Sequence, residues 1–183
     1  MNRRLAQGFQ GDPAPHGRPP VEAVVALGAN LGDRARTIAT AVAALGHLPL
    51  VDDVRASEPI ESVAIKPQGP DASAPAYLNA VALLTTRLAP SVLLDYLHAI
   101  EERHGRERRE RWGDRTLDLD IVVYDDVTLN SPDLTLPHPR AGERDFVLAP
   151  WAQLEPDATL PGLGRIDALI ATVPEDYAAE ALL

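Results

Sequence analysis

The chain has 183 residues, of which 17 are Lys or Arg and 27 are Asp or Glu, so its formal net charge at pH 7 is −10. This length predicts one domain that folds without cross-links, and the lack of cysteine excludes a disulfide framework, a thiolate metal site and a thiol nucleophile. No apolar run reaches the ~20 residues that span a bilayer, and the N-terminus lacks a signal-peptide core. We therefore expect a cytoplasmic protein with no membrane partner, and the acidic balance argues against nucleic acid as a partner.

The first part of the chain predicts a tail followed by a strand, a helix and a second strand. Residues 1–20 include four Pro and three Gly and show no apolar periodicity, which is typical of a disordered tail. Residues 21–183 are expected to form the single domain. The elements predicted here are a strand over Val21–Gly28, a helix from Asp33 to about Leu45, a strand over Leu50–Ile60 that extends towards Val63, and a long loop over Ala64–Ala76.

The second part of the chain repeats the strand–helix–strand pattern and then adds smaller elements. The predicted elements are a strand over Tyr77–Thr86, a helix from Pro90 that stops by Gly105, a strand over Leu117–Tyr124, a hairpin near Val127–Thr135, and helices over about 143–154 and 166–173. The core order is therefore βαββαβ. This order predicts an α+β fold of the ferredoxin-like class, an antiparallel sheet covered by helices, with an additional C-terminal hairpin and helices.

Arginine is concentrated in one part of this acidic chain. Six of its arginines fall within 13 residues: Arg103, Arg106, Arg108, Arg109, Arg111 and Arg115. Such a cluster favours the binding of a compact anion. Acidic residues alternate with these arginines, so a solvated charged loop is the alternative, and charge alone leaves both interpretations open. Trp112 could cover a nucleotide in this segment or anchor the loop.

Two aspartates follow the arginine cluster within a predicted strand. Asp118 and Asp120 point to one face, because side chains alternate along a strand, while Leu119 points to the other. Carboxylates at this spacing, about 7 Å of backbone, can share a hard cation or hold a pair of metal ions. The alternative is a solvent-facing strand edge, but two aspartates on one face repel unless a cation neutralises them. The pattern therefore favours a metal site beside a polyphosphate.

The run Arg111–Val122 resembles the signature of the 6-hydroxymethyl-7,8-dihydropterin pyrophosphokinase family. Further segments resemble other motifs of this family, in the family's order: Ala26–Asp33, Tyr77–Ala80, Gly105–Arg108, Pro137–Arg140 and Arg144–Phe146. The similarity extends from about Val21 to Pro161. It implies a ferredoxin-like fold and an enzyme of folate biosynthesis that transfers the diphosphate of ATP to the hydroxymethyl group of the pterin, with release of AMP. ATP as co-substrate, two Mg²⁺ ions and a monomeric chain are also implied.

The resemblance also implies roles for individual residues. By resemblance, Asp118 and Asp120 hold both metal ions, and Arg106 and Arg115 act with them in catalysis by stabilising charge on the transferring group. The implied ATP-binding residues are Glu101, Arg106, Arg108, Trp112, Arg115, Ile121, His138 and Arg144, and the implied pterin-binding residues are Tyr77, Asn79 and Phe146. Without the resemblance, Glu101 would be expected on an exposed helix surface.

The chain departs from the family pattern at several positions. Ala29 replaces the usual Ser, Asp114 replaces the usual Pro, and residues 58–76 form a longer segment than usual, which affects how the pterin is recognised. The register of Arg108 and Arg109 is ambiguous. Two other functions stay open: a different Mg²⁺-dependent nucleotidyl- or glycosyltransferase that uses the aspartate pair, and a ferredoxin-like domain that binds a small ligand or RNA.

Overall fold

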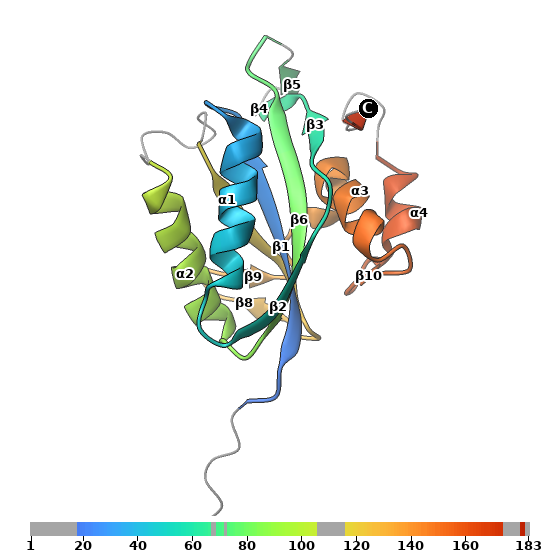
Figure 1. The fold of residues 1–183 in the computed structure, drawn as a ribbon. Coiled ribbons are helices and arrows are strands. Elements are labelled where there is room, and N and C mark those ends of the chain that lie inside the picture. The colour runs from blue at the N-terminus through green and yellow to red at the C-terminus, as the bar shows by residue number, and fades with distance from the viewer. Residues whose placement is uncertain (1–17, 67–68, 72, 106–115, 174–179, 182–183) are drawn as a thin grey trace, which may run out of the picture.

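The computed structural model describes residues 18–66, 69–71, 73–105, 116–173 and 180–181. Its centre is a six-stranded sheet in the order β12-β3-β6-β1-β7, with β2 also paired to β6, and every pairing is antiparallel (Figure 1). The strands are β1 (Val21–Ala29), β2 (Val51–Ala56), β3 (Ile60–Ser62), β6 (Tyr77–Thr86), β7 (Asp118–Tyr124) and β12 (Glu180–Ala181). The expected ferredoxin-like architecture is confirmed.

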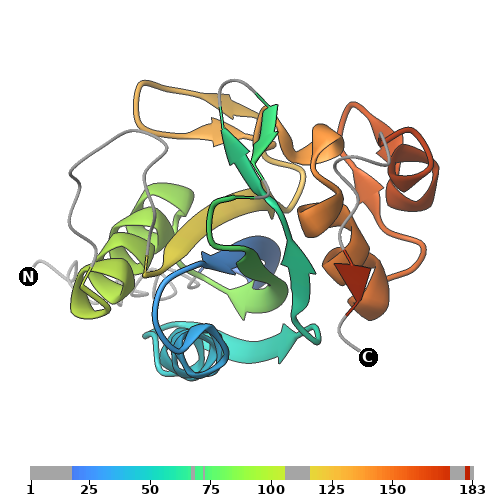
Figure 2. The ribbon, with the colours of Figure 1, turned by 90° about the horizontal axis from the view of Figure 1, so that it is seen from above.

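Helices cover both faces of this sheet. Helices α1 (Arg34–Gly46) and α2 (Pro90–Arg103) lie on one face, and α3 (Asp145–Leu154) and α4 (Ile166–Ile170) lie on the other (Figures 1 and 2). The alternation of each strand separates the two cores. Ala23, Val25 and Leu27 of β1 pack on the α1–α2 side, whereas Val24 packs on the α3 side with Val81.

Local sequence signals account for the ends of the helices. The Asp33 side chain accepts a hydrogen bond from the backbone N–H of Arg36 at 3.0 Å, so it caps α1 as predicted. Pro90 occupies the first turn of α2, where its missing N–H has no intrahelical role. The strands over 21–28, 77–86 and 117–124 are confirmed to within one residue.

The segment between α1 and β6 differs from its prediction. The strand predicted over Leu50–Ile60 and towards Val63 is two strands, β2 and β3, which pair with successive parts of β6. At the break, the N–H of Ser57 donates to the Val81 carbonyl and the Ser57 hydroxyl accepts from the Val81 N–H. The predicted loop over 64–76 was also wrong in part, because it contains a hairpin of β4 (Ala64–Lys66) and β5 (Gly69–Asp71).

The C-terminal part contains small elements that were predicted only in part. The hairpin of β8 (Leu129–Asn130) and β9 (Thr135–Leu136) is confirmed. A 3₁₀ helix (Ala141–Glu143) precedes α3, which therefore begins later than predicted, and α4 ends at Ile170 instead of 173. The hairpin of β10 (Thr159–Leu160) and β11 (Gly164–Arg165) and the strand β12 were not predicted.

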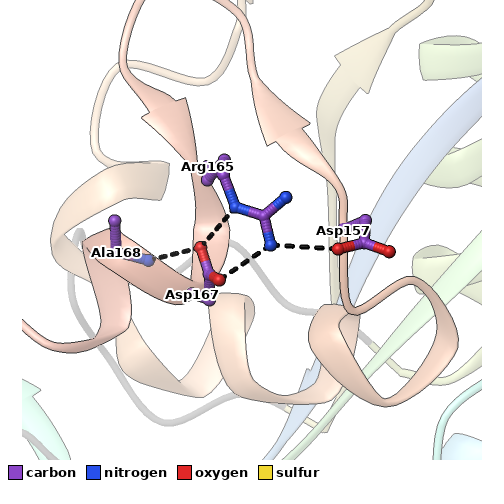
Figure 3. A network of polar contacts seen from close by, with 4 residues as sticks. All are labelled: Asp157, Arg165, Asp167 and Ala168. Atoms are coloured by element: carbon purple, nitrogen blue, oxygen red, sulfur yellow. Dashed lines mark hydrogen bonds and ion pairs between the residues drawn. The ribbon is translucent and has the colours of Figure 1, made fainter.

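An exposed ion-pair network joins the β10–β11 hairpin to α4 (Figure 3). The guanidinium of Arg165 donates to both carboxylate oxygens of Asp167, at 3.0 and 2.8 Å, and to Asp157 at 3.0 Å. These hydrogen bonds raise the pKa of Arg165 and lower that of Asp167. The Asp167 carboxylate also accepts the N–H of Ala168, so the network fixes the first turn of α4.

The structure bears on the predicted tail and on the expectation of no membrane span only through the residues it describes. Of the predicted tail, residues 1–20, only 18–20 are described. Among the described helices, none combines the length and the apolar character that a membrane span requires.

Candidate active site

The face of the sheet that carries α3 changes character along its strands. Under α3 it presents apolar side chains, among them Val24, Val81 and Leu83. Farther along, at the end from which the β4–β5 hairpin projects, Gly28 of β1 lies between Asn79 of β6 and Asp118 of β7 in the pairing register. These cross-strand neighbours share one face of the sheet, so an amide and a carboxylate flank a glycine.

Gly28 allows a close approach of the side chains around it. A Cβ atom at this position would lie 3.3 Å from Oδ1 of Asn79 and 3.7 Å from a ring carbon of Tyr77. A glycine inside a strand often marks a place where another group comes close to the backbone. The predicted pterin residues Tyr77 and Asn79 are therefore brought together over the glycine of β1.

Asn79 is held in place from the neighbouring strand. Its Nδ2 donates to the Ser62 hydroxyl at 2.9 Å, and both side chains are buried. This bond fixes which way the amide points, so its donor and acceptor ends are presented in a defined order. Neither Ser62 nor Gly28 was among the predicted site residues. Gly28 could have been found as a glycine at the end of an apolar strand, whereas nothing in the local sequence around Ser62 marks it.

Asp118 and Asp120 lie on one face of β7, as predicted. Both are half-exposed, whereas Leu119 and Ile121 between and after them are buried on the α1–α2 side. Ile121 was predicted to bind ATP, but its side chain lies in the core on the opposite face, so any contact of Ile121 with a ligand near the aspartates runs through its main chain. The shared face of the two carboxylates is thus confirmed.

Arg144 and Phe146 approach the aspartates from the start of α3. Nη1 of Arg144 lies 3.9 Å from Oδ2 of Asp120, and the guanidinium carbon lies 5.7 Å from the centre of the Phe146 ring. Burial lowers the pKa of Arg144, while Asp120 opposes that effect. The guanidinium group of an arginine stays protonated in proteins, so Arg144 keeps its charge. A largely desolvated cation therefore faces the carboxylate pair from the α3 side of the sheet.

His138 lies beside the same charges and is neutral. Burial, followed by the charges of Arg144 and Arg140, lowers its pKa to about 4, against the opposing effect of Asp118. Its Nδ1 accepts the N–H of Arg140 at 3.1 Å, which leaves the ring proton on Nε2. The backbone N–H of His138 donates to the Val122 carbonyl at 2.8 Å and so ties this segment to β7. At neutral pH, His138 is thus a hydrogen-bond donor without charge.

Glu101 is the clearest correction among the predicted site residues. It was expected on an exposed helix surface from the residues alone, but it is fully buried on α2. Its Oε1 accepts the backbone N–H of Leu119 at 2.8 Å, so Glu101 joins α2 to β7 between the two aspartates. The partner lies 18 residues farther along the chain, which is why local periodicity gave no sign of it.

Four predicted residues, Arg106, Arg108, Trp112 and Arg115, lie outside the described residues, as do Arg109 and Arg111. The described chain ends before this segment at Gly105 and resumes at Thr116, two residues before β7. In the chain, these residues therefore directly precede the strand that carries Asp118 and Asp120.

The donor set suits a hard cation that is shared with a substrate. No group of three or more acidic or histidine side chains that could hold a metal occurs within the described ranges. Mg²⁺ is ordinarily held by one or two carboxylates, with the remaining positions filled by water and substrate phosphates. The half-exposed pair of Asp118 and Asp120 supplies that number of carboxylates, so the residues present fit Mg²⁺.

Comparisons with known proteins agree with this geometry. The model of the family described as 7,8-dihydro-6-hydroxymethylpterin-pyrophosphokinase matches residues 24–156, well over half of the chain. Over 150 residues the chain is 44% identical to the 2-amino-4-hydroxy-6-hydroxymethyldihydropteridine pyrophosphokinase of Pseudomonas aeruginosa, which covers 82% of this chain and 90% of that protein. The protein of the same name from Bacillus subtilis is 40% identical over 141 residues, or 75% of this chain and 82% of that one.

A solved structure supports the fold. The crystal structure of Plasmodium falciparum HPPK-DHPS A437G with pteroate superposes with a TM-score of 0.63 at 13% identity. The match covers 85% of this chain and 43% of that chain, so the chain spans less than half of the larger protein.

Proposed function

Because the chain belongs to the 7,8-dihydro-6-hydroxymethylpterin-pyrophosphokinase family, we propose that it transfers the β,γ-diphosphate of ATP to 6-hydroxymethyl-7,8-dihydropterin and releases AMP, a step of folate biosynthesis. One observation carries this proposal beyond the family match. The row of Asn79, Gly28 and Asp118 across three strands sets an amide and an aromatic ring directly beside a carboxylate pair. A heterocycle and a polyphosphate can therefore bind side by side.

The pterin binds at the Asn79 end of this row. The amide of Asn79, oriented by Ser62, pairs with the polar edge of the heterocycle through its donor and acceptor. Tyr77 and Phe146 lie on its two faces, since one ring starts β6 and the other lies in the first turn of α3. Because Gly28 carries no side chain, the side chains of Asn79 and Tyr77 lie close to β1 beside the ring.

The triphosphate binds at the aspartate end. Asp118 and Asp120 would hold two Mg²⁺ ions, which neutralise phosphate oxygens and make the attacked phosphorus more electrophilic. Arg144 adds a fixed positive charge next to Asp120, and neutral His138 donates a hydrogen bond without adding repulsion between cations. Arg106, Arg108 and Arg115, together with Trp112 and the main chain of Ile121, complete the proposed ATP site, and Glu101 acts on it indirectly by holding Leu119 between the two aspartates.

The chain's own contribution to the reaction is positioning and charge neutralisation. The hydroxymethyl oxygen forms a bond to the β-phosphorus, the bond between that phosphorus and the bridging α–β oxygen breaks, and AMP leaves with the electron pair. The hydroxyl proton passes to solvent. Arg106 and Arg115 stabilise charge on the transferring group, because that charge is redistributed in the transition state.

We also propose how the chain is organised and which partners it has. Residues 21–183 form one domain and residues 1–20 lie outside it. The partners are the two small-molecule substrates, and the chain acts as a monomer without nucleic acid. The net charge of −10 supports the last point, since nucleic-acid binding usually needs a basic surface.

Product analysis tests the reaction. Purified protein is incubated with Mg²⁺, ATP and 6-hydroxymethyl-7,8-dihydropterin, and nucleotides are separated by ion-exchange chromatography. We expect AMP in amounts equal to the pterin diphosphate formed. ADP in place of AMP would indicate transfer of a single phosphoryl group, and neither product would point to a ligand-binding domain. Replacing the pterin with sugar nucleotides tests the glycosyl- or nucleotidyltransferase alternative.

A further inference from the structure

Arg34 joins three separate segments of the fold. It is the first residue of α1, and its two terminal nitrogens reach different partners. Nη2 contacts Oε1 of Glu61 on β3 at 2.6 Å, and Nη1 donates to the backbone carbonyl of Ala76 at 2.8 Å. The side chains of Arg34 and Glu61 are only 31% and 36% exposed. The guanidinium fork suits this arrangement because its geometry is rigid and its donors diverge.

Both partners of Arg34 are neighbours of residues in the proposed pterin site. Glu61 directly precedes Ser62, whose hydroxyl receives the hydrogen bond from Asn79. Ala76 directly precedes Tyr77, the first residue of β6. A shift of Glu61 would thus move Ser62, whose hydroxyl orients Asn79. A shift of Ala76 would move Tyr77.

The same two contacts close the segment that contains the β4–β5 hairpin. This segment, residues 63–75, leaves the sheet after Ser62 and returns to it before Tyr77. Arg34 holds Glu61, two residues before its start, and Ala76, directly after its end. Bringing the ends of a segment together costs conformational entropy, and a charge-assisted contact at its base opposes opening.

We propose that Arg34 is a positioning residue for pterin binding: by clamping Glu61 and Ala76, it fixes the base of segment 63–75 and with it Ser62 and Tyr77. This role rests on the proposed function, because it presumes that the pterin binds there. Arg34 itself does not touch the reacting atoms. Its effect is expected on pterin affinity, while ATP binding at the aspartate end is unchanged.

The other end of β6 supplies a matched control. Arg87 directly follows β6, and its Nη1 lies 2.9 Å from Oδ1 of Asp52 on β2, with exposures of 37% and 41%. The two ion pairs are alike in chemistry and exposure and flank the same strand. They differ in their distance from the proposed pterin residues, so Arg87→Met removes an equivalent ion pair without disturbing that site.

The experiment compares Arg34→Met, Arg34→Lys and Arg87→Met with the wild type. Calorimetry measures pterin affinity and, in a separate titration, the affinity for a non-hydrolysable ATP analogue. Amide hydrogen exchange is followed over residues 61–77. For Arg34→Met we expect pterin affinity to fall by about 10- to 100-fold, the scale for misplaced contacts. ATP-analogue affinity should stay within about twofold, and exchange over 61–77 should rise. Arg34→Lys should restore little, because one ammonium cannot reach both partners.

Each other outcome has a definite meaning. Unchanged pterin affinity, or unchanged exchange, in Arg34→Met would overturn the positioning role while the wild type still makes AMP. An equal loss in Arg87→Met would also overturn it, because the effect would then be general loss of stability. A wild type that binds no pterin would refute the proposed function and this role together, and the wild-type measurement alone identifies that case.

Discussion

The two ends of the α3-facing side of the sheet use the same strands for opposite purposes. Under α3, β1 and β6 contribute Val24 and Val81 to a buried apolar cluster. Four positions along β1 and two along β6, the same strands present Gly28 and Asn79, and β7 presents a pair of carboxylates. The backbone pairing is continuous through both regions. The difference therefore comes from whether a helix covers the strand face, since a covered face must be apolar and an uncovered one can carry polar groups.

The boundary between the two regions lies at the start of α3. Arg144 and Phe146 stand at that boundary. Phe146 packs against the apolar cluster, whereas Arg144 extends to Asp120. Substitutions on the two sides of the boundary should therefore separate effects on activity from effects on folding.

The largest effect is expected at the carboxylate pair. Replacing Asp118 or Asp120 with Ala should reduce AMP release at saturating Mg²⁺ on the order of 10³-fold, the scale for losing one group that stabilises charge. In Asp118→Ala the melting temperature should stay unchanged or rise, because two like charges on one strand face repel. In Asp120→Ala the loss of the contact with the largely buried Arg144 offsets that gain. Rate assays and calorimetric melting check both expectations.

Asp126→Asn serves as the control for the carboxylate pair. Asp126 is an exposed carboxylate just beyond the other end of β7, so its loss should leave turnover intact. Near-normal activity in Asp118→Ala and Asp120→Ala would make the pair a surface feature, and unfolding of either variant would make it structural.

A polar group placed under α3 should act on folding instead. Val81→Asn buries an amide in the apolar cluster, and we expect a loss of about 3 kcal/mol in the free energy of unfolding. Urea denaturation measures it. If the variant is as stable as the wild type, then α3 does not seal this part of the face.

The reverse exchange should spare folding and damage binding. Asn79→Val keeps a similar volume but removes the amide that we propose pairs with the pterin, so pterin affinity should fall by about 10²-fold. Calorimetric titration with pterin gives the affinity. Unfolding should be affected less than in Val81→Asn, and a variant that binds pterin normally would remove Asn79 from the site.

The lowered pKa of His138 makes the stability of the protein depend on pH. Its pKa of about 4 is below its ordinary value of 6.5, so between these values the unfolded state binds more protons than the folded state. Its contribution is complete above pH 6.5 and is lost as the pH falls towards 4. In the metal-free protein we expect His138 to account for about 2 kcal/mol of the stability lost between pH 7 and pH 5.

A neutral replacement isolates this contribution. His138→Gln cannot take up the proton. Its unfolding free energy should therefore fall less than that of the wild type as the pH falls from 7 to 5. Parallel curves for the two proteins from pH 7 to pH 5 would contradict the depressed pKa.

The smallest effect is expected at Gly28. In Gly28→Ala the new methyl group would lie 3.3 Å from Oδ1 of Asn79, whose amide is held by Ser62 and cannot easily move away. Pterin affinity should fall by about three- to tenfold, the lower range for one added carbon, with little change in melting temperature. Fluorescence titration with pterin measures it. Tighter binding in this variant would show that pterin binding does not require the close approach of Asn79 to β1 at Gly28.

The two regions also differ in how far they could be predicted. The strands over 21–28, 77–86 and 117–124 were found because apolar runs and alternation are local signals. For the same reason the common face of Asp118 and Asp120 followed from their spacing. The burial of Glu101 did not, since its partner Leu119 lies 18 residues farther along the chain.

The segment between Ile60 and Tyr77 shows a second limit. Its proline and glycine content predicted a loop, yet three-residue strands form there because they pair with each other and with β6. Such short strands have too few residues for periodicity to appear, and their formation depends on tertiary contacts. The contact of Ser62 with Asn79 and the clamp by Arg34 depend on this arrangement and could not be read from the chain.

The edge of the sheet at β7 has a consequence for the behaviour of the protein in concentrated solution. In the described part of the sheet β7 is the last strand, and an edge strand with unpaired backbone groups can recruit a strand from another molecule. Here the Leu119 N–H is bonded to a buried carboxylate, and the Val122 carbonyl is bonded to the His138 N–H. A second chain could add to this edge only by breaking both bonds, so the contacts that shape the site also guard against intermolecular aggregation.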